Sequence, residues 1–229
     1  MKIAEIFHSI QGEGKLMGLP SIFVRASGCN LRCTWCDTPY TSWNPEGREM
    51  PVAEIMRAIG EFSSKHVVLT GGEPMIMPDV MELCEAIKSN GYQLTIETAA
   101  TVFHSVPLDL ASLSPKLSNS TPTEREDGRF ADMHDRQRLN IPMIQQFIDH
   151  SPDFQLKFVV SREADVKEIE SLLGQLKNWS PSDVLLMPEG IDAEVLHERS
   201  NWIGNICKRK GYRFCPRLHI LLYGNKRGT

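Results

Sequence analysis

The chain has 229 residues, of which 41% are hydrophobic and 24% are charged, and its formal net charge is −4. This is the composition of an ordinary globular protein long enough to bury its own core without a disulfide or a structural metal. The slightly acidic balance gives no electrostatic basis for binding nucleic acid or an anionic membrane. The chain has neither the apolar stretch of a secretory signal at its start nor a run of 18 apolar residues, so we expect a cytoplasmic protein.

Short apolar runs typical of buried strands alternate along the chain with amphipathic runs typical of helices. This alternation predicts strands over residues 21–26, 66–72, 92–99, 110–116, 155–160, 183–190 and 217–223. It predicts helices over residues 51–62, 78–90, 141–149, 163–177 and 192–210. Gly91 is expected to follow the end of the second helix, and Ser161 is expected to cap the start of the fourth.

The order of strands and helices predicts an α/β fold with a mostly parallel sheet and right-handed crossovers. About six strands are too few for a complete eight-stranded barrel, so we expect a partial, open, TIM-like barrel in a single domain over residues 1–229. The polar, turn-rich segment 118–138 is expected to form a flexible loop or a mobile lid. The basic end of the chain, residues 223–229, is expected to fray.

Three of the six cysteines, Cys29, Cys33 and Cys36, lie close together in the sequence CNLRCTWC. In a reducing compartment such a cluster indicates metal or redox chemistry more than disulfides. Soft thiolates suit an iron–sulfur cluster or zinc, and a structural zinc site would need a fourth ligand such as His8 or His66. The other cysteines are expected to lie outside any metal site: Cys84, Cys207 and Cys215.

The spacing C-x3-C-x2-C resembles that of the radical S-adenosylmethionine superfamily. The sequence TGGEP, residues 70–74, follows an apolar strand and stands in the order that this superfamily shows. The resemblance implies that Cys29, Cys33 and Cys36 bind three irons of a [4Fe–4S] cluster and that the fourth iron is left for S-adenosylmethionine (SAM). An open coordination position is what a catalytic metal centre needs, and one electron delivered to SAM would release a 5′-deoxyadenosyl radical.

Further segments resemble the 7-carboxy-7-deazaguanine synthases of that superfamily along nearly the whole chain. These segments are FHSIQGEG (7–14), IFVRASGCNLRC (22–33), IETAAT (96–101), SPKL (114–117) and LHILLYGNKRGT (218–229). The resemblance implies a carbon–nitrogen lyase that rearranges 6-carboxy-5,6,7,8-tetrahydropterin to 7-carboxy-7-deazaguanine with loss of ammonia, a step toward 7-deazapurines such as queuosine. The radical would abstract the hydrogen atom, so no residue is expected to be a catalytic acid or base.

Carried over residue by residue, the resemblance implies a substrate-binding set of Ile10, Gln11, Gly12, Glu13, Arg25, Thr70 and His219. It implies a SAM-binding set of Trp35, Asp37, Gly72, Glu73, Ser114, Pro115, Lys116, Met187, Pro188, Glu189 and Gly190. At residues 187–190 the sequence MPEG departs from the QPIS pattern of other members, so backbone contacts are expected there. Thr38 is implied as a Mg²⁺ ligand, and a hydroxyl together with waters suits this hard cation.

The side chains suit a planar pterin that carries a carboxylate. Gln11 offers a donor and an acceptor, Glu13 accepts from N–H groups, and Arg25 offers a planar fork to a carboxylate. The resemblance also implies a homodimer and a reductant of the flavodoxin or ferredoxin type.

Three alternatives remain open from the residues. A glycyl-radical-activating enzyme shares the cysteine loop and the GGEP sequence but needs a protein partner. An electron-transfer iron–sulfur protein is disfavoured by the missing fourth cysteine and the large α/β body. A zinc-stapled binding module would contain one zinc ion per chain and no sulfide.

Overall fold

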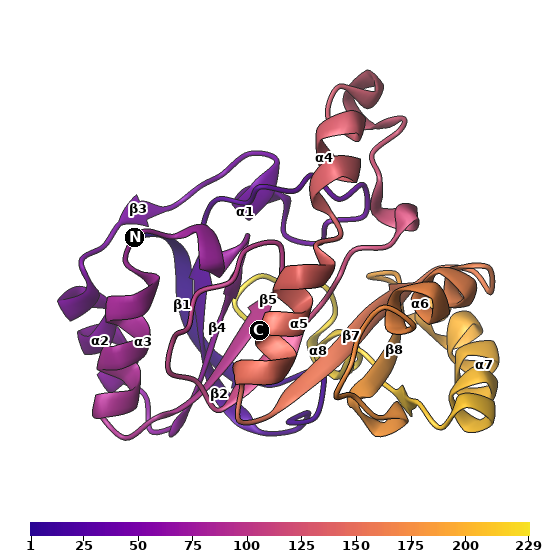
Figure 1. Ribbon diagram of the computed structural model, residues 1–229. Helices are drawn as coiled ribbons and strands as arrows, with labels where there is room; N and C mark the ends of the chain where they lie inside the picture. The colour runs from indigo at the N-terminus through magenta and orange to yellow at the C-terminus, as the bar shows by residue number, and fades with distance from the viewer.

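Nine strands form one continuous sheet in the computed structural model, which describes residues 1–229 (Figure 1). The strands are β1 (Lys2–Ile10), β2 (Pro20–Ala26), β3 (Arg48–Glu49), β4 (His66–Gly71), β5 (Gln93–Thr98), β6 (Leu110–Leu113), β7 (Phe154–Val160), β8 (Val184–Pro188) and β9 (Arg213–Phe214). Their order is β3-β1-β2-β4-β5-β6-β7-β8-β9. Strand β1 runs antiparallel to both of its neighbours, and all pairs from β2 to β9 are parallel.

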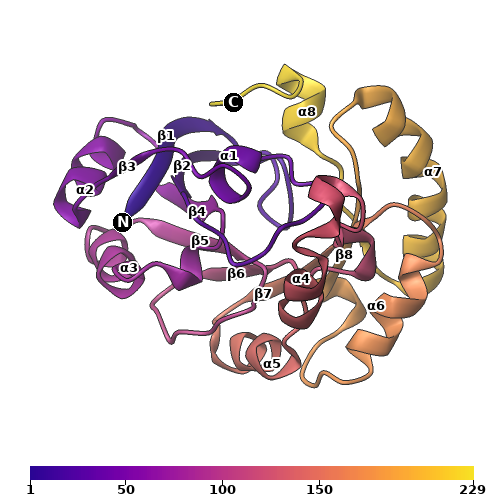
Figure 2. The ribbon, with the colours of Figure 1, turned by 90° about the horizontal axis from the view of Figure 1, so that it is seen from above.

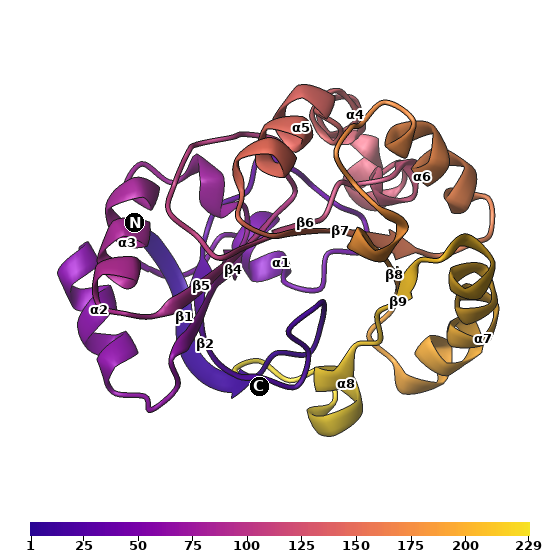
Figure 3. The same cartoon turned by 60° about the horizontal axis from the view of Figure 1, so that its bottom comes forward.

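The sheet curves into an open arc with helices on its outer side (Figure 3). The outer helices are α2 (Val52–Gly60), α3 (Val80–Ser89), α5 (Ile141–His150), α6 (Asp165–Leu173) and α7 (Ala193–Lys210), and the remaining helices are α1 (Pro39–Ser42), α4 (Ala131–Gln137) and α8 (Leu218–Tyr223). Helix α8 and the C-terminus lie near the open side of the arc (Figure 2). The structure thus has the predicted mostly parallel, open sheet, and no helix is long and apolar enough to cross a membrane.

The main core lies between the sheet and the outer helices. Strand β4 is buried along almost all of its length, and Leu69 and Ile96 of adjacent strands are fully buried. Helix α3 adds Leu83, Cys84 and Ile87, which recur at helical spacing and are also fully buried. Burial of each large apolar side chain stabilises the fold by about 1.5–3 kcal/mol, so this core holds the strand ends in place around the site. Cys84 is buried as predicted.

Most predicted elements are present, and the exceptions have local causes. The six strands predicted between residues 21 and 190 correspond to β2 and β4 to β8, and all five predicted helices occur. The strand predicted over 217–223 is wrong because these residues form helix α8, in which Leu221 and Leu222 are exposed. A six-residue apolar run does not distinguish a strand from a helix by its period. Strands β1, β3 and β9 were not predicted.

The two predicted helix ends differ in outcome. Gly91 follows the end of α3 with a φ of 77°, a left-handed conformation that glycine adopts without strain, so this prediction is confirmed. Ser161 does not cap α6, which begins only at Asp165. Instead the Asp165 carboxylate accepts hydrogen bonds from the backbone N–H groups of Ser161 and Arg162. The Asp165 side chain therefore fixes the segment that leads into α6, and no side chain caps this helix.

The segment 118–138 contains more structure than the predicted loop. It holds short 3-10 turns at Ser118–Ser120 and Arg125–Gly128, followed by helix α4, which rises above the strand ends (Figure 1). The basic C-terminal residues are also held and not frayed. Arg227 donates hydrogen bonds to Glu5 and Glu46, and its guanidinium lies 4.1 Å from the ring centroid of Tyr40.

Candidate functional site

The carboxyl ends of the parallel strands open into one cavity of about 360 Å³. In sheets of this kind ligands bind at that edge, because the loops that follow the strands converge there. The predicted substrate residues in the cavity wall are Ile10, Gln11, Gly12, Glu13, Arg25, Thr70 and His219. The predicted cosubstrate and metal residues in the same wall are Cys29, Cys33, Trp35, Cys36, Asp37, Thr38, Gly72, Ser114, Lys116 and Met187.

Glu73 of the GGEP sequence does not face the cavity. Its side chain is fully buried, and its carboxylate accepts hydrogen bonds from the Thr98 hydroxyl (2.6 Å) and from the backbone N–H groups of Met75 (3.1 Å) and Ala99 (2.8 Å). The carboxylate is therefore engaged by donors of the protein itself, and its contact with an ammonium or ribose group of the cosubstrate stays a prediction. The residue instead ties the end of β4 to the end of β5.

Four other predicted cosubstrate residues also lie outside the cavity wall: Pro115, Pro188, Glu189 and Gly190. The Glu189 carboxylate pairs with Arg199 of helix α7. The Gly190 carbonyl accepts a hydrogen bond from Arg217. This segment thus supports the wall from behind, and only Met187 of the MPEG sequence faces the cavity.

Gly71, the last residue of β4, and Gly72, which follows it, let the cysteine loop pack closely against the sheet. Gly72 donates its N–H to the Ala26 carbonyl (3.0 Å), and a Cβ at Gly72 would lie 1.9 Å from the Gly28 carbonyl oxygen. Gly71 has a φ of 119°, and Gly28 has a φ of 118°. Only glycine combines this backbone conformation with so close an approach. The GGEP sequence therefore positions the start of the cysteine loop through its backbone.

Three thiols line the cavity, and none of the cysteines forms a disulfide. Burial raises the pKa of both Cys29 and Cys33 to about 12, so both are protonated thiols until a metal displaces the protons. No three His, Cys, Asp or Glu side chains are placed to hold a single metal ion. A set of three thiols spread around a cavity fits a cluster in which each thiolate binds a different iron.

The other cysteines do not join this set. Cys84 of helix α3 and Cys207 of helix α7 are buried in the core. Cys215 is not in the cavity wall, packs with Met187 in a small apolar cluster, and accepts the backbone N–H of Gly14 at 3.1 Å through its sulfur. The donor set around the cysteine loop thus remains three thiols with no fourth cysteine.

A group of charged side chains lies opposite the cysteine loop. The Glu13 carboxylate pairs with Lys157 and with Arg217 (3.2 Å to Nε), and His219 Nε2 lies 4.0 Å away. Burial would raise the pKa of Glu13, but Lys157 and Arg217 outweigh it and hold that pKa well below its usual range. Burial lowers the pKa of His219, so its imidazole is neutral near pH 7. Glu13 is therefore a permanent anion and His219 a neutral donor or acceptor.

Arg217 links the charged group to the cysteine loop. Its guanidinium pairs with Asp37, just after Cys36, and with Glu13, while it also donates to the Gly190 carbonyl. Only 7% of its side chain is exposed. Three segments that come from distant parts of the sequence therefore meet at one buried cation.

Arg217, Lys157 and Glu97 were missed as site residues. Glu97 accepts hydrogen bonds from Gln11 Nε2 (3.2 Å) and Thr70 Oγ1 (2.7 Å) and faces the cavity. A lysine within the buried strand QLKFVV was a usable signal, because a buried charge needs a partner. No comparable signal marks Arg217, since the apolar run that begins with it predicts a strand.

Arg25 keeps part of its guanidinium available. Its Nε donates to Glu5 at 2.7 Å, and neither terminal nitrogen has a hydrogen-bond partner in the protein. The guanidinium lies 5.4 Å from the ring centroid of Phe7, which stacks on Phe23 with centroids 5.0 Å apart. Glu5 and this aromatic pair orient the two free nitrogens, which can bind a carboxylate in a bidentate way.

Comparisons with known proteins agree with this geometry. The sequence profile of the Radical SAM superfamily matches residues 23–116, which contain the cysteine loop and the GGEP sequence. A 7-carboxy-7-deazaguanine synthase from Rhodopirellula baltica is 44% identical over 227 residues, covering 99% of this chain and 88% of the relative. One from Halobacterium salinarum is 43% identical, covering 98% of this chain and 91% of the relative.

Comparisons with solved structures agree with these sequence comparisons. The crystal structure of QueE from Escherichia coli matches with a TM-score of 0.70 and 26% identity, covering 95% of this chain and 94% of that one. Streptococcus suis SuiB bound to S-adenosylmethionine shares the fold over 83% of this chain, with a TM-score of 0.55 and 14% identity. With its three-thiol loop, its open parallel sheet and its full-length relatives, the chain belongs to the 7-carboxy-7-deazaguanine synthase family of the radical SAM superfamily.

Proposed function

We propose that this protein is a radical SAM lyase that converts 6-carboxy-5,6,7,8-tetrahydropterin to 7-carboxy-7-deazaguanine with loss of ammonia in 7-deazapurine biosynthesis. The observation that carries this proposal is that three clustered thiols and a polar wall of Gln11, Glu13 and Glu97 open into the same cavity. Relatives that share nearly the whole chain carry the name of this activity. A 5′-deoxyadenosyl radical formed beside the three thiols would therefore lie in the same cavity as the substrate.

The cysteine side of the cavity is the proposed cofactor site. Cys29, Cys33 and Cys36 would hold a [4Fe–4S] cluster, which with bound SAM supplies a 5′-deoxyadenosyl radical that abstracts a hydrogen atom. Lys116 donates to the Ser114 carbonyl (2.6 Å) and hydroxyl (2.8 Å), and its ammonium lies 5.9 Å from the Trp35 ring centroid. These two side chains form a cationic and aromatic wall beside the thiols, which suits the carboxylate and adenine of SAM.

The Glu13 side of the cavity is the proposed substrate site. The carboxylates of Glu13 and Glu97 accept hydrogen bonds from amino and ring N–H groups, and the free nitrogens of Arg25 pair with the substrate carboxylate. Neutral His219 adds one donor or acceptor. These residues bind and orient the pterin, and the protein's main contribution to rate is to hold the reacting atom beside the radical.

Further parts of the proposal rest on the family resemblance. Thr38 faces the cavity two residues after Cys36 and is the proposed Mg²⁺ ligand, where the cation would bind the substrate carboxylate. Residues 1–229 are proposed to act as one domain in a homodimer. The reductant is proposed to be of the flavodoxin or ferredoxin type, and the site of action is the cytoplasm.

The test is anaerobic turnover. Protein reconstituted with iron and sulfide is reduced and mixed with SAM, Mg²⁺ and 6-carboxytetrahydropterin, and 7-carboxy-7-deazaguanine is followed by mass spectrometry. The proposal predicts this product and its dependence on Mg²⁺. Accumulation of 5′-deoxyadenosine without the product would contradict the substrate assignment and favour a glycyl-radical-activating enzyme. If protein that holds a [4Fe–4S] cluster forms neither compound, an electron-transfer role is favoured.

A further inference from the structure

His134 of helix α4 is a fully buried imidazole that the proposed reaction does not use. Its Nδ1 lies 3.0 Å from the backbone nitrogen of Arg32, which stands between Cys29 and Cys33. Its Nε2 lies 2.9 Å from the hydroxyl oxygen of Ser120. Both ring nitrogens are thus engaged, one by the cysteine loop and one by the segment that precedes α4.

The partners determine which nitrogen carries the proton. The Arg32 backbone nitrogen can only donate, so Nδ1 of His134 accepts and Nε2 carries the hydrogen. Nε2–H then donates to Ser120, whose own hydroxyl donates to the Leu117 carbonyl at 2.6 Å. A one-directional chain of hydrogen bonds therefore runs from the cysteine loop, through His134, to the residue that follows the SPK sequence.

Other bonds between the same two segments surround this chain. Thr34 donates its N–H to the Ser120 carbonyl (2.8 Å), and Trp35 Nε1 donates to the Asn119 carbonyl (3.0 Å). Arg125 donates to the Thr34 carbonyl (3.0 Å). The residues between the second and third cysteines are thus fixed from the segment 117–138 as well.

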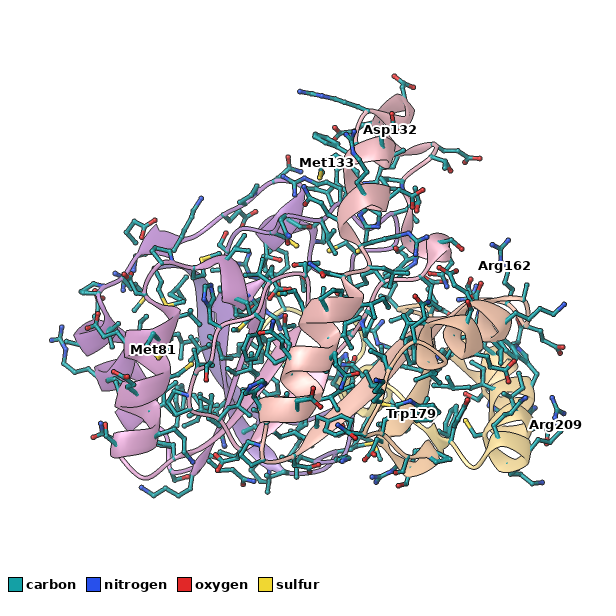
Figure 4. All side chains as sticks on the ribbon, viewed as in Figure 1. Met81, Asp132, Met133, Arg162, Trp179 and Arg209 are labelled. Carbon is teal, nitrogen blue, oxygen red and sulfur yellow. The ribbon has the colours of Figure 1, made fainter.

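Aromatic packing closes the contact at the start of α4. The ring of Phe130 lies edge-on to Trp43 at 5.7 Å and 5.4 Å from the Arg32 guanidinium, and Trp43 donates its indole N–H to the Cys33 carbonyl at 3.0 Å. Asp132 and Met133, which precede His134, are labelled on this helix in Figure 4. The hydrogen bond from the Arg32 backbone nitrogen to His134 Nδ1 shows that the helix turns its histidine toward the cysteine loop.

We propose that the segment 117–138 is a buttress that holds the cysteine loop in its cluster-binding conformation before any cluster is present, and that His134 is its central positioning residue. The proposal rests on the proposed function only in treating Cys29, Cys33 and Cys36 as cluster ligands. A neutral imidazole suits this position, because it satisfies a buried backbone N–H without placing a fixed charge between the loop and its support. The segment expected from its composition to be a lid is thus a fixed support.

The test uses the metal-free, reduced protein and measures the alkylation rates of single cysteines with iodoacetamide by mass spectrometry. Cys84 in the main core is the internal reference, because it reacts only when the fold opens globally. His134→Ala is expected to raise the rate of the buried Cys33 relative to Cys84 by about tenfold or more, the factor that corresponds to about 1.4 kcal/mol, and to raise the rates of the partly exposed Cys29 and Cys36 by less. The proposal is wrong if these relative rates stay at the wild-type level.

Matched variants separate positioning from simple loss of packing. His134→Asn keeps an acceptor near the place of Nδ1 and is expected to restore rates close to wild type, whereas His134→Gln keeps only a group near Nε2 and is not. The exposed His104→Ala serves as a control with no expected effect. Should His134→Ala not fold, Ser120→Ala removes the second partner and predicts a smaller rise at the same cysteines. If His134→Asn restores the alkylation rates no better than His134→Gln does, the role proposed for Nδ1 is wrong.

This assay contains no cluster, SAM or pterin, so its outcome is independent of the substrate assignment. If wild-type protein makes no 7-carboxy-7-deazaguanine while His134→Ala exposes the three thiols, the buttress stands and the proposed substrate falls.

Discussion

The two walls of the cavity are held by different kinds of interaction. The cysteine loop is fixed by backbone hydrogen bonds, by close glycine packing at Gly72 and by the neutral imidazole of His134. The opposite wall around Glu13 is fixed by ion pairs with Lys157 and Arg217. Both kinds of wall line one cavity at the same edge of one sheet.

The difference follows from what each wall is proposed to bind. Metal-bound thiolates bring their own negative charge, so the cysteine loop needs no fixed anion from the hydrogen bonds that hold it. A pterin edge rich in N–H groups needs fixed acceptors, and the cations beside Glu13 keep it ionised at all physiological pH values. Arg217 is the exception that joins both walls, because it pairs with Glu13 on one side and Asp37 on the other.

Loss of one cluster thiol is the change to the cysteine loop with the largest expected effect. Cys33→Ala is expected to abolish cluster binding and to lower product formation by a factor of about 10³ or more, because the remaining two thiols cannot hold the cluster in a productive position. Iron, sulfide and product per chain are measured together. Cys84→Ala, which changes a buried cysteine outside the site, is the control. Equal iron and sulfide content in both variants would contradict the assignment of the loop.

Neutralising the opposite wall is expected to have a smaller effect on activity and none on the cluster. Glu13→Gln keeps the shape of the side chain but removes the charge that faces Lys157 and Arg217, and a hydrogen bond to a charged group contributes about 1.5–3 kcal/mol. Loss of this energy should lower the rate of product formation at low pterin concentration roughly 10- to 100-fold. Iron and sulfide content should stay at the wild-type level. A matching loss of iron from this variant would show that the two walls are not separate.

The contributions of His134 and Glu13 to stability should be lost in different pH ranges. Burial lowers the pKa of His134 to about 4, below its value near 6.5 in the unfolded chain, so the unfolded state takes up a proton first. The contribution of neutral His134 to the free energy of unfolding is fully present above about pH 6.5. Up to about 3 kcal/mol of it is lost as the pH falls to about 4. The Glu13 pKa is lowered, so its contribution is full above about pH 4.5 and is lost only in stronger acid.

Urea unfolding of the metal-free protein between pH 7 and pH 4 measures this difference. The slope of unfolding free energy against pH should flatten in His134→Gln and should stay unchanged in His104→Ala. An equal slope in wild type and His134→Gln would mean that His134 does not remain neutral in the folded chain.

Backbone packing at the cysteine loop gives the smallest predicted effect. Gly72→Ala places a Cβ against the Gly28 carbonyl and should lower the unfolding free energy by about 1–3 kcal/mol through overpacking. Gly60→Ala, in helix α2 with no atom near the added Cβ, should raise it by about 0.5–1 kcal/mol. Thermal unfolding of both variants checks the opposite signs. Equal effects would show that the loop does not depend on this close approach.

Much of this arrangement was predictable from local patterns. The apolar runs around Leu69 and Phe158 are long and continuous, so the buried parallel strands were found, and the cysteine spacing with GGEP marked the cofactor wall. Strand β1 was missed because it is mostly half-buried and mixes polar with apolar residues. Helix α4 was missed because its seven residues are mostly polar and owe their order to tertiary contacts such as that of His134 with Arg32.

The ion pairs of the site lie beyond such patterns. Glu13 and Arg217 are 204 positions apart in sequence, and nothing local to either predicts the other. Glu73 shows the reverse case, since a motif placed it correctly at a strand end while its carboxylate turned inward to Thr98. Motifs thus located the wall of the cavity, and only the fold determined which side chains face it.

The central claim is that the cluster thiols and the substrate residues serve one shared cavity. It is tested most directly by anaerobic turnover of 6-carboxytetrahydropterin that carries deuterium on its reduced ring carbons, followed by mass spectrometry of SAM and 5′-deoxyadenosine. The account predicts that deuterium from the pterin appears in the 5′-deoxyadenosyl group, together with formation of 7-carboxy-7-deazaguanine. A 5′-deoxyadenosyl group that stays free of deuterium while the enzyme turns over would contradict it.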